Sequence, residues 1–314
     1  MALDLVSVDG AAATRRFRLV SGRRFAQAAV DLGSYPYSGD PKSTCGLSFE
    51  EVRVPTPAAD GPAWLVPGAR TTWVVFVHGR AAGRGEALRA MPTIAALGLP
   101  ILVVTYRNDP GGPRSPDGLY HLGATEWQDL EAGVRYALRH GARRVILFGI
   151  SMGGAIVTSF LNHSVLSGSV AGVILDAPVL DWDAAVRLGA RARRVPLFLT
   201  ALAEVVVSLR TGFQWSAEGK MGPGPFRTPA LLFHGGADDV VPIGPTESLA
   251  AALGDRATFR KTVGAGHAQS WNFDPEGYEQ ALHEWVLHTA ALVEVRPRSA
   301  PPGQRLDRAS RPRR

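Results

Sequence analysis

Residues 145–154 read Val-Ile-Leu-Phe-Gly-Ile-Ser-Met-Gly-Gly, and the predicted architecture follows from them. The first half is apolar and uncharged, which is typical of a strand buried on both faces of a parallel sheet. Residues 149–153 then form a G-x-S-x-G pattern centred on Ser151, and residues 155–161 can form a helix. A serine on such a tight strand-to-helix turn has a strained backbone and an exposed hydroxyl, and the two glycines allow strand and helix to approach closely. The pattern predicts that Ser151 is a nucleophile, although alone it also fits an ordinary glycine-rich turn.

Strand and helix patterns alternate along much of the chain. Apolar strand patterns occupy residues 49–54, 63–66, 71–77, 100–106, 145–150, 170–175, 229–233 and 257–263, and helical patterns occupy 84–97, 125–139, 155–161, 243–253 and 275–293. This alternation predicts an α/β fold with a mostly parallel, doubly wound sheet that is covered by helices on both faces. The first two strands, each followed by a proline, predict an antiparallel pair at the edge. Thr125 and Gln128 predict a capping box at the start of a helix.

The alternation also suggests domain boundaries. The α/β core occupies residues 49–180 and 226–294, and an insertion at residues 181–225 separates its two parts. Residues 1–48 are irregular in pattern and predict an N-terminal lead-in, with a short helix around residues 15–30 and a wrapping loop.

The insertion predicts a small helical cap over the site. Its apolar helix, residues 195–209, has no sheet face left to cover, and apolar walls bury most of a bound ligand. On this hypothesis Phe198 and Leu202 line an acyl pocket and set its chain-length preference. The alternative is a peripheral helix pair packed on the sheet.

Composition and charge limit the possible partners. The 314 residues are 46% hydrophobic and 20% charged, which is ordinary for a globular protein with a full core. Seven arginines and Asp307 give residues 295–314 a net charge of +6, equal to the +6 of the whole chain, so residues 1–294 are formally neutral. The folded body therefore carries no charge pattern for nucleic acid, and the Pro/Arg/Ser-rich tail is expected to be disordered.

The compartment is expected to be the cytoplasm. A single cysteine, Cys45, rules out an internal disulfide and a multi-cysteine metal site, and it fits a reducing environment. Asp4 and Asp9 precede any basic residue, which argues against a signal peptide. The apolar run at residues 195–209 is too short to span a bilayer and contains Glu204, so we expect no transmembrane segment.

A loop after the strand at residues 229–233 offers a carboxylate. Residues 234–242 read His-Gly-Gly-Ala-Asp-Asp-Val-Val-Pro, at the carboxyl end of a strand, where open α/β sheets place their ligands. A serine needs a histidine base, and a carboxylate must orient that histidine. Asp238 is the predicted carboxylate, with Asp239 and Asp176 as competitors; a helix N-cap is the alternative role for Asp238.

The predicted base is His267. Residues 264–267 read Gly-Ala-Gly-His after the last strand, and the glycines suit a loop tip that reaches over the site. Among the eight histidines, only His267 follows Ser151 and Asp238 in chain order within a strand-end loop.

The loop at residues 78–81, His-Gly-Arg-Ala, follows another buried strand and offers oxyanion donors. Acyl transfer forms a tetrahedral oxyanion, and each fixed backbone N–H stabilises it by about 3 kcal/mol. We expect these donors to be the N–H groups of Met152 and Arg80, although a plain strand-to-helix turn would look the same in sequence.

Together these motifs resemble the α/β-hydrolase superfamily over roughly residues 49–293. More closely, the chain is similar to bacterial α/β hydrolases with Tyr-Arg-Asn-Asp and Tyr-His-Leu-Gly-x-Thr-Glu-Trp loops, here residues 106–109 and 120–127. That group is often labelled prolyl-oligopeptidase-like or S33-like. Both motifs overlap a long loop at residues 107–122, and loops of this length are usually functional.

The resemblance and the residues together predict a serine hydrolase with a Ser-His-Asp triad and an acyl-enzyme intermediate. We expect a small-molecule acyl substrate, most simply a carboxylic ester, and no cofactor or metal. A serine peptidase or amidase is the alternative within this chemistry. A non-catalytic scaffold of the same fold is the alternative outside it. The sequence predicts no oligomeric state.

Overall fold

The computed structural model describes the backbone of residues 2–9, 12–17, 37–216 and 218–295 and the side chains of residues 37–216 and 218–291. The chain divides into two compact units, Met1–Ser34 and Tyr35–Arg314.

The first unit contains a two-stranded antiparallel sheet, β1 (Ala2–Asp9) with β2 (Ala12–Phe17). The helix predicted around residues 15–30 is therefore wrong at its start, because residues 15–17 belong to β2. Its remainder from residue 18, and the tail from residue 296, lie outside the described residues.

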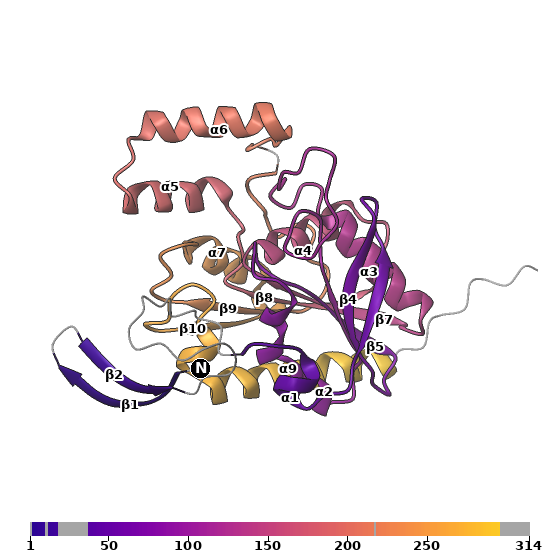
Figure 1. Ribbon diagram of the computed structural model, residues 1–314. Helices are drawn as coiled ribbons and strands as arrows, with labels where there is room; N and C mark the ends of the chain where they lie inside the picture. Colours follow the sequence, from indigo (N-terminus) through magenta and orange to yellow (C-terminus); the bar gives the residue numbers. More distant parts are fainter. Residues whose placement is uncertain (1, 10–11, 18–36, 217, 296–314) are drawn as a thin grey trace, which may run out of the picture. The chain divides into compact units, whose positions relative to one another are not determined.

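The second unit is built on an eight-stranded sheet in the order β3-β4-β6-β5-β7-β8-β9-β10 (Figure 1). Its strands are β3 (Glu50–Pro55), β4 (Asp60–Val66), β5 (Thr72–Val77), β6 (Ile101–Val104), β7 (Arg144–Ile150), β8 (Val170–Asp176), β9 (Ala230–Gly235) and β10 (Ala257–Thr262). β4 pairs antiparallel with both β3 and β6, and all other neighbours are parallel. The predicted edge pair and the mostly parallel sheet are confirmed.

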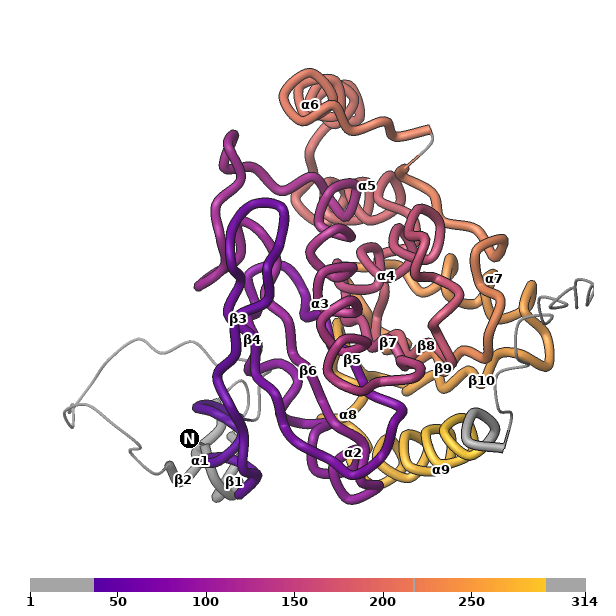
Figure 2. The backbone as a smooth tube through the Cα atoms, turned by 90° about the vertical axis from the view of Figure 1, so that its right-hand side faces the viewer, coloured from indigo at the N-terminus to yellow at the C-terminus, as the bar shows by residue number. Residues whose placement is uncertain are grey.

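Helices cover both faces of this sheet (Figures 1 and 2). One face carries α3 (Trp127–Arg139), α4 (Met152–His163) and α7 (Gly244–Leu253); the other carries α1 (Pro41–Cys45), η1 (Arg84–Arg89), α2 (Met91–Ala96), α8 (Ser270–Phe273) and α9 (Pro275–Val295). Short 3₁₀ turns, η2 (Ser167–Ser169) and η3 (Gly254–Arg256), precede β8 and β10. Successive residues of a strand pack on opposite faces of the sheet: Val75 belongs to one buried hydrophobic cluster and Phe76 to the other. Burial on both faces explains why the strands read as continuous apolar runs.

The segment between β8 and β9 forms two helices, α5 (Trp182–Ala192) and α6 (Leu197–Thr211). They pack against each other, with α6 outermost (Figures 1 and 2). The carboxylate of Asp181 accepts the backbone N–H of Ala184 and caps α5, and Gly212 ends α6 in the left-handed conformation. A single antiparallel bridge between Asp181 and Lys220 joins the two ends of the segment.

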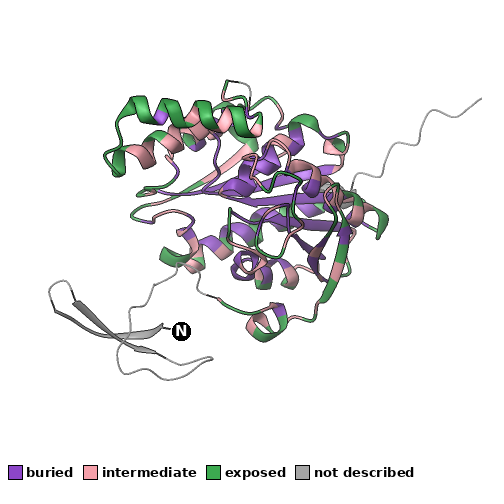
Figure 3. Ribbon diagram, turned by 45° about the horizontal axis from the view of Figure 1, so that its top comes forward, coloured by how far each residue is buried: buried purple, intermediate pink, exposed green. Residues whose placement is uncertain are grey.

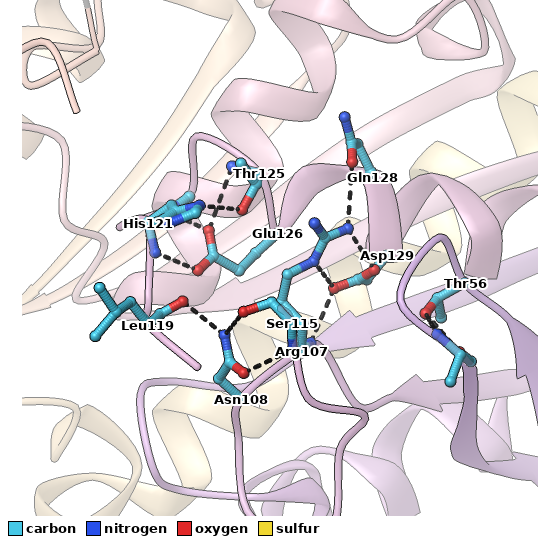
Figure 4. Close-up of polar contacts among 12 residues, drawn as sticks. Thr56, Arg107, Asn108, Ser115, Leu119, His121, Thr125, Glu126, Gln128 and Asp129 are labelled. Carbon is cyan, nitrogen blue, oxygen red and sulfur yellow. Dashed lines mark hydrogen bonds and ion pairs between the residues drawn. The ribbon is translucent and has the colours of Figure 1, made fainter. Parts of the chain in front are cut away.

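The predicted capping box of α3 is wrong. The helix begins at Trp127, and the hydroxyl of Thr125 contacts Nδ1 of His121 instead, at 2.9 Å (Figure 4). Glu126 occupies the N-cap position without a side-chain cap bond. Its buried carboxylate instead accepts the N–H groups of His121 and Gly123, which lie in the loop before the helix. Burial raises the pKa of Glu126, and these N–H groups oppose the shift only in part.

The helix predicted at residues 84–97 is divided into η1 and α2, and Pro92 stands in the first turn of α2. Proline has no N–H to continue a preceding helix but fits a first turn. No helix in the described part of the chain is long and apolar enough to cross a bilayer.

Candidate active site

Four loops converge at the carboxyl edge of the parallel strands. Arg80 follows β5, Ser151 follows β7, Asp238 follows β9 and His267 follows β10. Because the carboxyl ends of parallel strands meet at one edge, residues far apart in sequence are brought within reach of one another.

Ser151 lies on a strained turn between β7 and α4. Its backbone has φ 53° and ψ −117°, which an L-residue rarely adopts. Three backbone hydrogen bonds hold the turn: the N–H of Ser151 donates to the carbonyl of Asp176, and its own carbonyl accepts from Gly154 and Val179. The strain is thus supported by the end of β8 and the start of α4.

The two motif glycines are sterically required at this turn. A Cβ on Gly149 would lie 2.5 Å from the carbonyl oxygen of Gly153, and a Cβ on Gly153 would lie 2.2 Å from that of Val77. Side chains at either position would force α4 away from the sheet, so the close approach predicted from the sequence is present.

The imidazole of His267 lies between Ser151 and Asp238. Its Nε2 is 2.9 Å from the hydroxyl oxygen of Ser151, and its Nδ1 is 2.8 Å from Oδ2 of Asp238. An ionised carboxylate only accepts hydrogen bonds, so Nδ1 donates and Nε2 is left to accept the serine proton. The structure therefore joins the three predicted residues in one hydrogen-bonded series.

The carboxylate of Asp238 has other contacts besides the one with His267. Its side chain is buried; Oδ1 accepts the N–H groups of Val240 and Val241, and Oδ2 lies 3.3 Å from Nε2 of His234. Burial acts to raise the pKa of Asp238, but the hydrogen bonds from His234 and His267 outweigh it and hold the pKa below its ordinary value. Asp238 is thus ionised over the whole neutral range.

The competing carboxylates lie elsewhere. Asp239 is exposed and points toward the cavity described below. Asp176 is fully buried on the opposite side of the sheet edge, where it accepts the hydroxyl of Tyr278 at 3.1 Å. Burial raises the pKa of Asp176. Among the described residues, Asp238 is the carboxylate that contacts His267.

The loop that carries Arg80 is fixed at both neighbours. The N–H of Gly79 donates to Glu86 at 2.6 Å, the carbonyl of Gly79 accepts the hydroxyl of Tyr106 at 2.9 Å, and the N–H of Ala81 donates to Asp109 at 2.8 Å. Ala81 has φ 59°, so its left-handed conformation is supported by the Asp109 bond. Met152 begins α4, where an N–H has no acceptor within the helix.

Asp109 is in turn positioned by the long loop at residues 107–122. Its Oδ1 also accepts the hydroxyl of Tyr120 at 3.0 Å, and burial together with this carboxylate raises the pKa of Tyr120 to about 12. Figure 4 shows how the loop is anchored: the Arg107 guanidinium binds both oxygens of Asp129, and Asn108 binds Ser115 and Leu119. Asp109 belongs to the Tyr-Arg-Asn-Asp motif, but no role for its side chain was predicted from the sequence.

A cavity of about 670 Å³ adjoins Ser151. Its walls come from the loops at Arg80 and Leu122, from α4, α5 and α6, and from the loop after β9; the lining residues include Val179, Trp182, Val186, Val207, Trp215 and Val241. Most of the wall is apolar, as in sites that bury the body of a small ligand. Phe198 and Leu202, predicted to line the pocket, are instead exposed on the outside of α6.

Comparisons with known proteins agree with this architecture. A family model described as "Alpha/beta hydrolase family" matches residues 74–281. Rv2307c, an uncharacterized protein of Mycobacterium tuberculosis, is 25% identical over 242 residues, covering 73% of this chain and 75% of that protein.

Two solved structures illustrate the structural likeness. The Pyrococcus furiosus esterase Pf2001 is similar with a TM-score of 0.63 at 17% identity, covering 86% of this chain and 100% of that one. A puromycin-hydrolyzing peptidase of Mycobacterium tuberculosis has a TM-score of 0.57 at 18% identity, covering 78% of this chain and 39% of that one. At such identities these likenesses establish the shared fold and nothing finer.

Proposed function

The chain belongs to the alpha/beta hydrolase family, and we propose that it is a serine hydrolase that cleaves carboxylic esters through an acyl-enzyme intermediate. The observation that carries the proposal is the hydrogen-bonded series from the Ser151 hydroxyl through His267 to Asp238, beside a mostly apolar cavity. Nucleophile, base and orienting carboxylate in this geometry are the constellation of serine acyl transfer.

In the proposed reaction the Ser151 oxygen attacks the acyl carbon while Nε2 of His267 takes the hydroxyl proton. Asp238, ionised and hydrogen-bonded to Nδ1, stabilises the imidazolium that forms. His267 then gives the proton to the leaving alcohol, and the acyl group stays on Ser151. Water enters, His267 deprotonates it, and the acyl-enzyme is hydrolysed to the acid.

The oxyanion of each tetrahedral intermediate would be held by the N–H groups of Met152 and Arg80. Both residues line the cavity beside Ser151. Each such donor is worth about 3 kcal/mol when it is fixed before the reaction. The three hydrogen bonds on Gly79 and Ala81 supply that rigidity for the Arg80 loop.

Asp109 is therefore expected to act as a positioning residue for the Arg80 N–H. Asp109→Ala removes the acceptor for the Ala81 N–H, and we expect kcat to fall by about 10- to 100-fold with KM nearly unchanged, because a poorly placed oxyanion donor weakens transition-state binding. Asp109→Asn retains an acceptor oxygen and should recover much of the loss. Steady-state kinetics with p-nitrophenyl acetate gives both constants.

Asp117 provides a matched control for Asp109, since it is a carboxylate of the same loop that binds Ser115 and Leu119. Asp117→Ala should retain nearly normal kcat. Affinity for a trifluoromethyl ketone, which forms a tetrahedral adduct, should fall in parallel with kcat/KM only in Asp109→Ala. An unchanged adduct affinity in Asp109→Ala would refute the positioning role.

The cavity suggests that Val186, rather than Phe198, governs acyl chain length. Val186 of α5 lines the cavity, and Phe198 does not. Val186→Phe should shorten the pocket and reduce kcat/KM for p-nitrophenyl octanoate relative to the acetate by about tenfold, since each excluded methylene costs about 0.8 kcal/mol. Phe198→Ala should leave that ratio unchanged. Equal ratios in the wild type and Val186→Phe would assign α5 a purely structural role.

A peptidase or amidase remains the second candidate, because an amide substrate would use the same three residues. The fold likeness to a puromycin-hydrolyzing peptidase makes it worth testing. The ester proposal is favoured by the wall of the cavity, which among the described residues includes a single acid, Asp239, and so offers no acidic pair for a free amino terminus. Parallel assays on p-nitrophenyl esters and aminoacyl p-nitroanilides separate the two.

A further inference from the structure

The outward side of α6 is apolar. Seven large side chains, between 43% and 82% exposed, gather on this one helix: Leu197, Phe198, Leu199, Leu202, Val205, Val206 and Leu209. Phe198, Leu202, Val205 and Leu209 follow the spacing of a single helical stripe. We call these residues, without Leu197, the outer face of α6, because Leu197 lies seven residues before Glu204 and so on the side of the polar residues. Figure 3 shows α6 as a largely exposed helix at the edge of the molecule.

Apart from Arg210, the polar residues of α6 lie on its other side. Thr200 is only 6% exposed, and Glu204, Ser208 and Thr211 follow at helical spacing with intermediate burial. Glu204 lies near Asp183 and Arg187 of α5, and burial raises its pKa. A surface helix in water normally has the opposite orientation, with its apolar stripe inward. The orientation of α6 therefore fits an apolar neighbour on the outside.

Arginines flank the outer face at both ends. Arg191 and Arg194 are exposed before α6, and Arg210 is exposed in its last turn. Arg193 is also exposed but lines the cavity. Residues 191–210, all of which the structure describes, contain one acid, Glu204, and it is not exposed. An exposed surface that combines aliphatic side chains with arginines and no carboxylate complements an anionic, partly apolar surface.

We propose that the outer face of α6 docks onto an anionic lipid bilayer. The aliphatic side chains enter the boundary between headgroups and acyl chains, and the flanking arginines contact the phosphates. A second copy of this chain fits less well. An antiparallel pairing of two α6 helices brings the arginines of both copies together with no exposed acid between them. Docking requires no catalytic step, so it is independent of the proposed esterase activity.

The test is vesicle co-sedimentation of the full chain. We expect binding to vesicles of equal parts phosphatidylcholine and phosphatidylglycerol, weaker binding to phosphatidylcholine alone, and a decrease as salt screens the arginines. Leu202→Gln/Leu209→Gln should reduce the binding constant by about tenfold or more, because two exposed aliphatic anchors are lost from a helix that glutamine tolerates. Val165→Gln/Leu287→Gln, an exposed aliphatic pair outside α6, should bind as the wild type does.

Four outcomes would overturn the proposal. They are wild-type protein that stays in the supernatant, equal binding to both vesicle types, an α6 double variant that binds as tightly as the wild type, and loss of binding only when residues 296–314 are removed. Light scattering tests the alternative that a second copy of this chain binds the outer face. A wild-type dimer that the α6 double variant converts to a monomer, with no vesicle binding by either, would make the outer face an interface between copies.

Discussion

Replacing Ser151 by alanine is expected to lower kcat for p-nitrophenyl esters by about 10⁶-fold, to the level left by binding and the oxyanion donors alone. The substitution removes the oxygen that lies 2.9 Å from Nε2 of His267 and leaves the base without a proton to take. Alanine retains the strained φ of 53° at the turn, so the melting temperature should change little.

Ser159 serves as the control for Ser151 because it lies on the same helix, α4, without contact to His267. Ser159→Ala should keep wild-type kinetics. If Ser151→Ala turned over esters at more than about one hundredth of the wild-type rate, another nucleophile would be doing the chemistry. If neither protein turned over any ester or amide, the non-catalytic scaffold would become the better account.

Asp238→Asn is expected to lower kcat by about 10⁴-fold, and Asp239→Asn to stay within about tenfold of the wild type. Asparagine at position 238 can present its amide N–H to Nδ1 of His267, which favours the tautomer that cannot accept the serine proton. Asp239 is exposed on the cavity wall, so its loss affects substrate contacts at most. Steady-state kinetics on both variants decides between them, and the reverse ranking would contradict the assignment.

The pH dependence of stability provides a second measurement on Asp238. Its pKa is lowered in the folded protein, so the ionised side chain stabilises the fold above its unfolded value of about 3.9. That contribution is lost as the pH falls through the lowered folded value. Acid unfolding of Asp238→Asn should therefore lack this component, while Asp239→Asn should retain it.

Much of the fold could be predicted because both faces of the sheet are buried. Strands such as β7 and β8 are buried along almost their whole length, and that burial is visible as uninterrupted apolar sequence. The turn at Ser151 could be predicted for a local reason, since the glycines it requires are part of the same five-residue motif. Chain order then selected Asp238 and His267, which the structure joins to Ser151.

Contacts between distant loops could not be predicted from sequence. Asp109 accepts the N–H of Ala81, and this bond depends on how two loops meet at the sheet edge. The capping box of α3 was predicted wrongly because the Thr125 hydroxyl contacts Nδ1 of His121 in the loop before the helix instead of capping the first turn.

The orientation of α6 was also predicted wrongly, for a physical reason. Apolar content suggested that Phe198 and Leu202 would face the site, as apolar side chains of a helix in water do. In the structure, the side of α6 that carries Thr200 and Glu204 faces inward, and the side that carries Phe198 and Leu202 is exposed. The apolar composition of a helix does not determine which of its sides is buried against the protein.

The most direct test of the account is peptide mass spectrometry of the wild-type protein after treatment with a fluorophosphonate probe. Such probes phosphonylate a serine only when a base activates it. We expect one adduct, on the peptide that contains Ser151, and no adduct after prior incubation with a trifluoromethyl ketone. An adduct on a different residue, or an unmodified Ser151 peptide in protein that hydrolyses esters, would contradict this expectation.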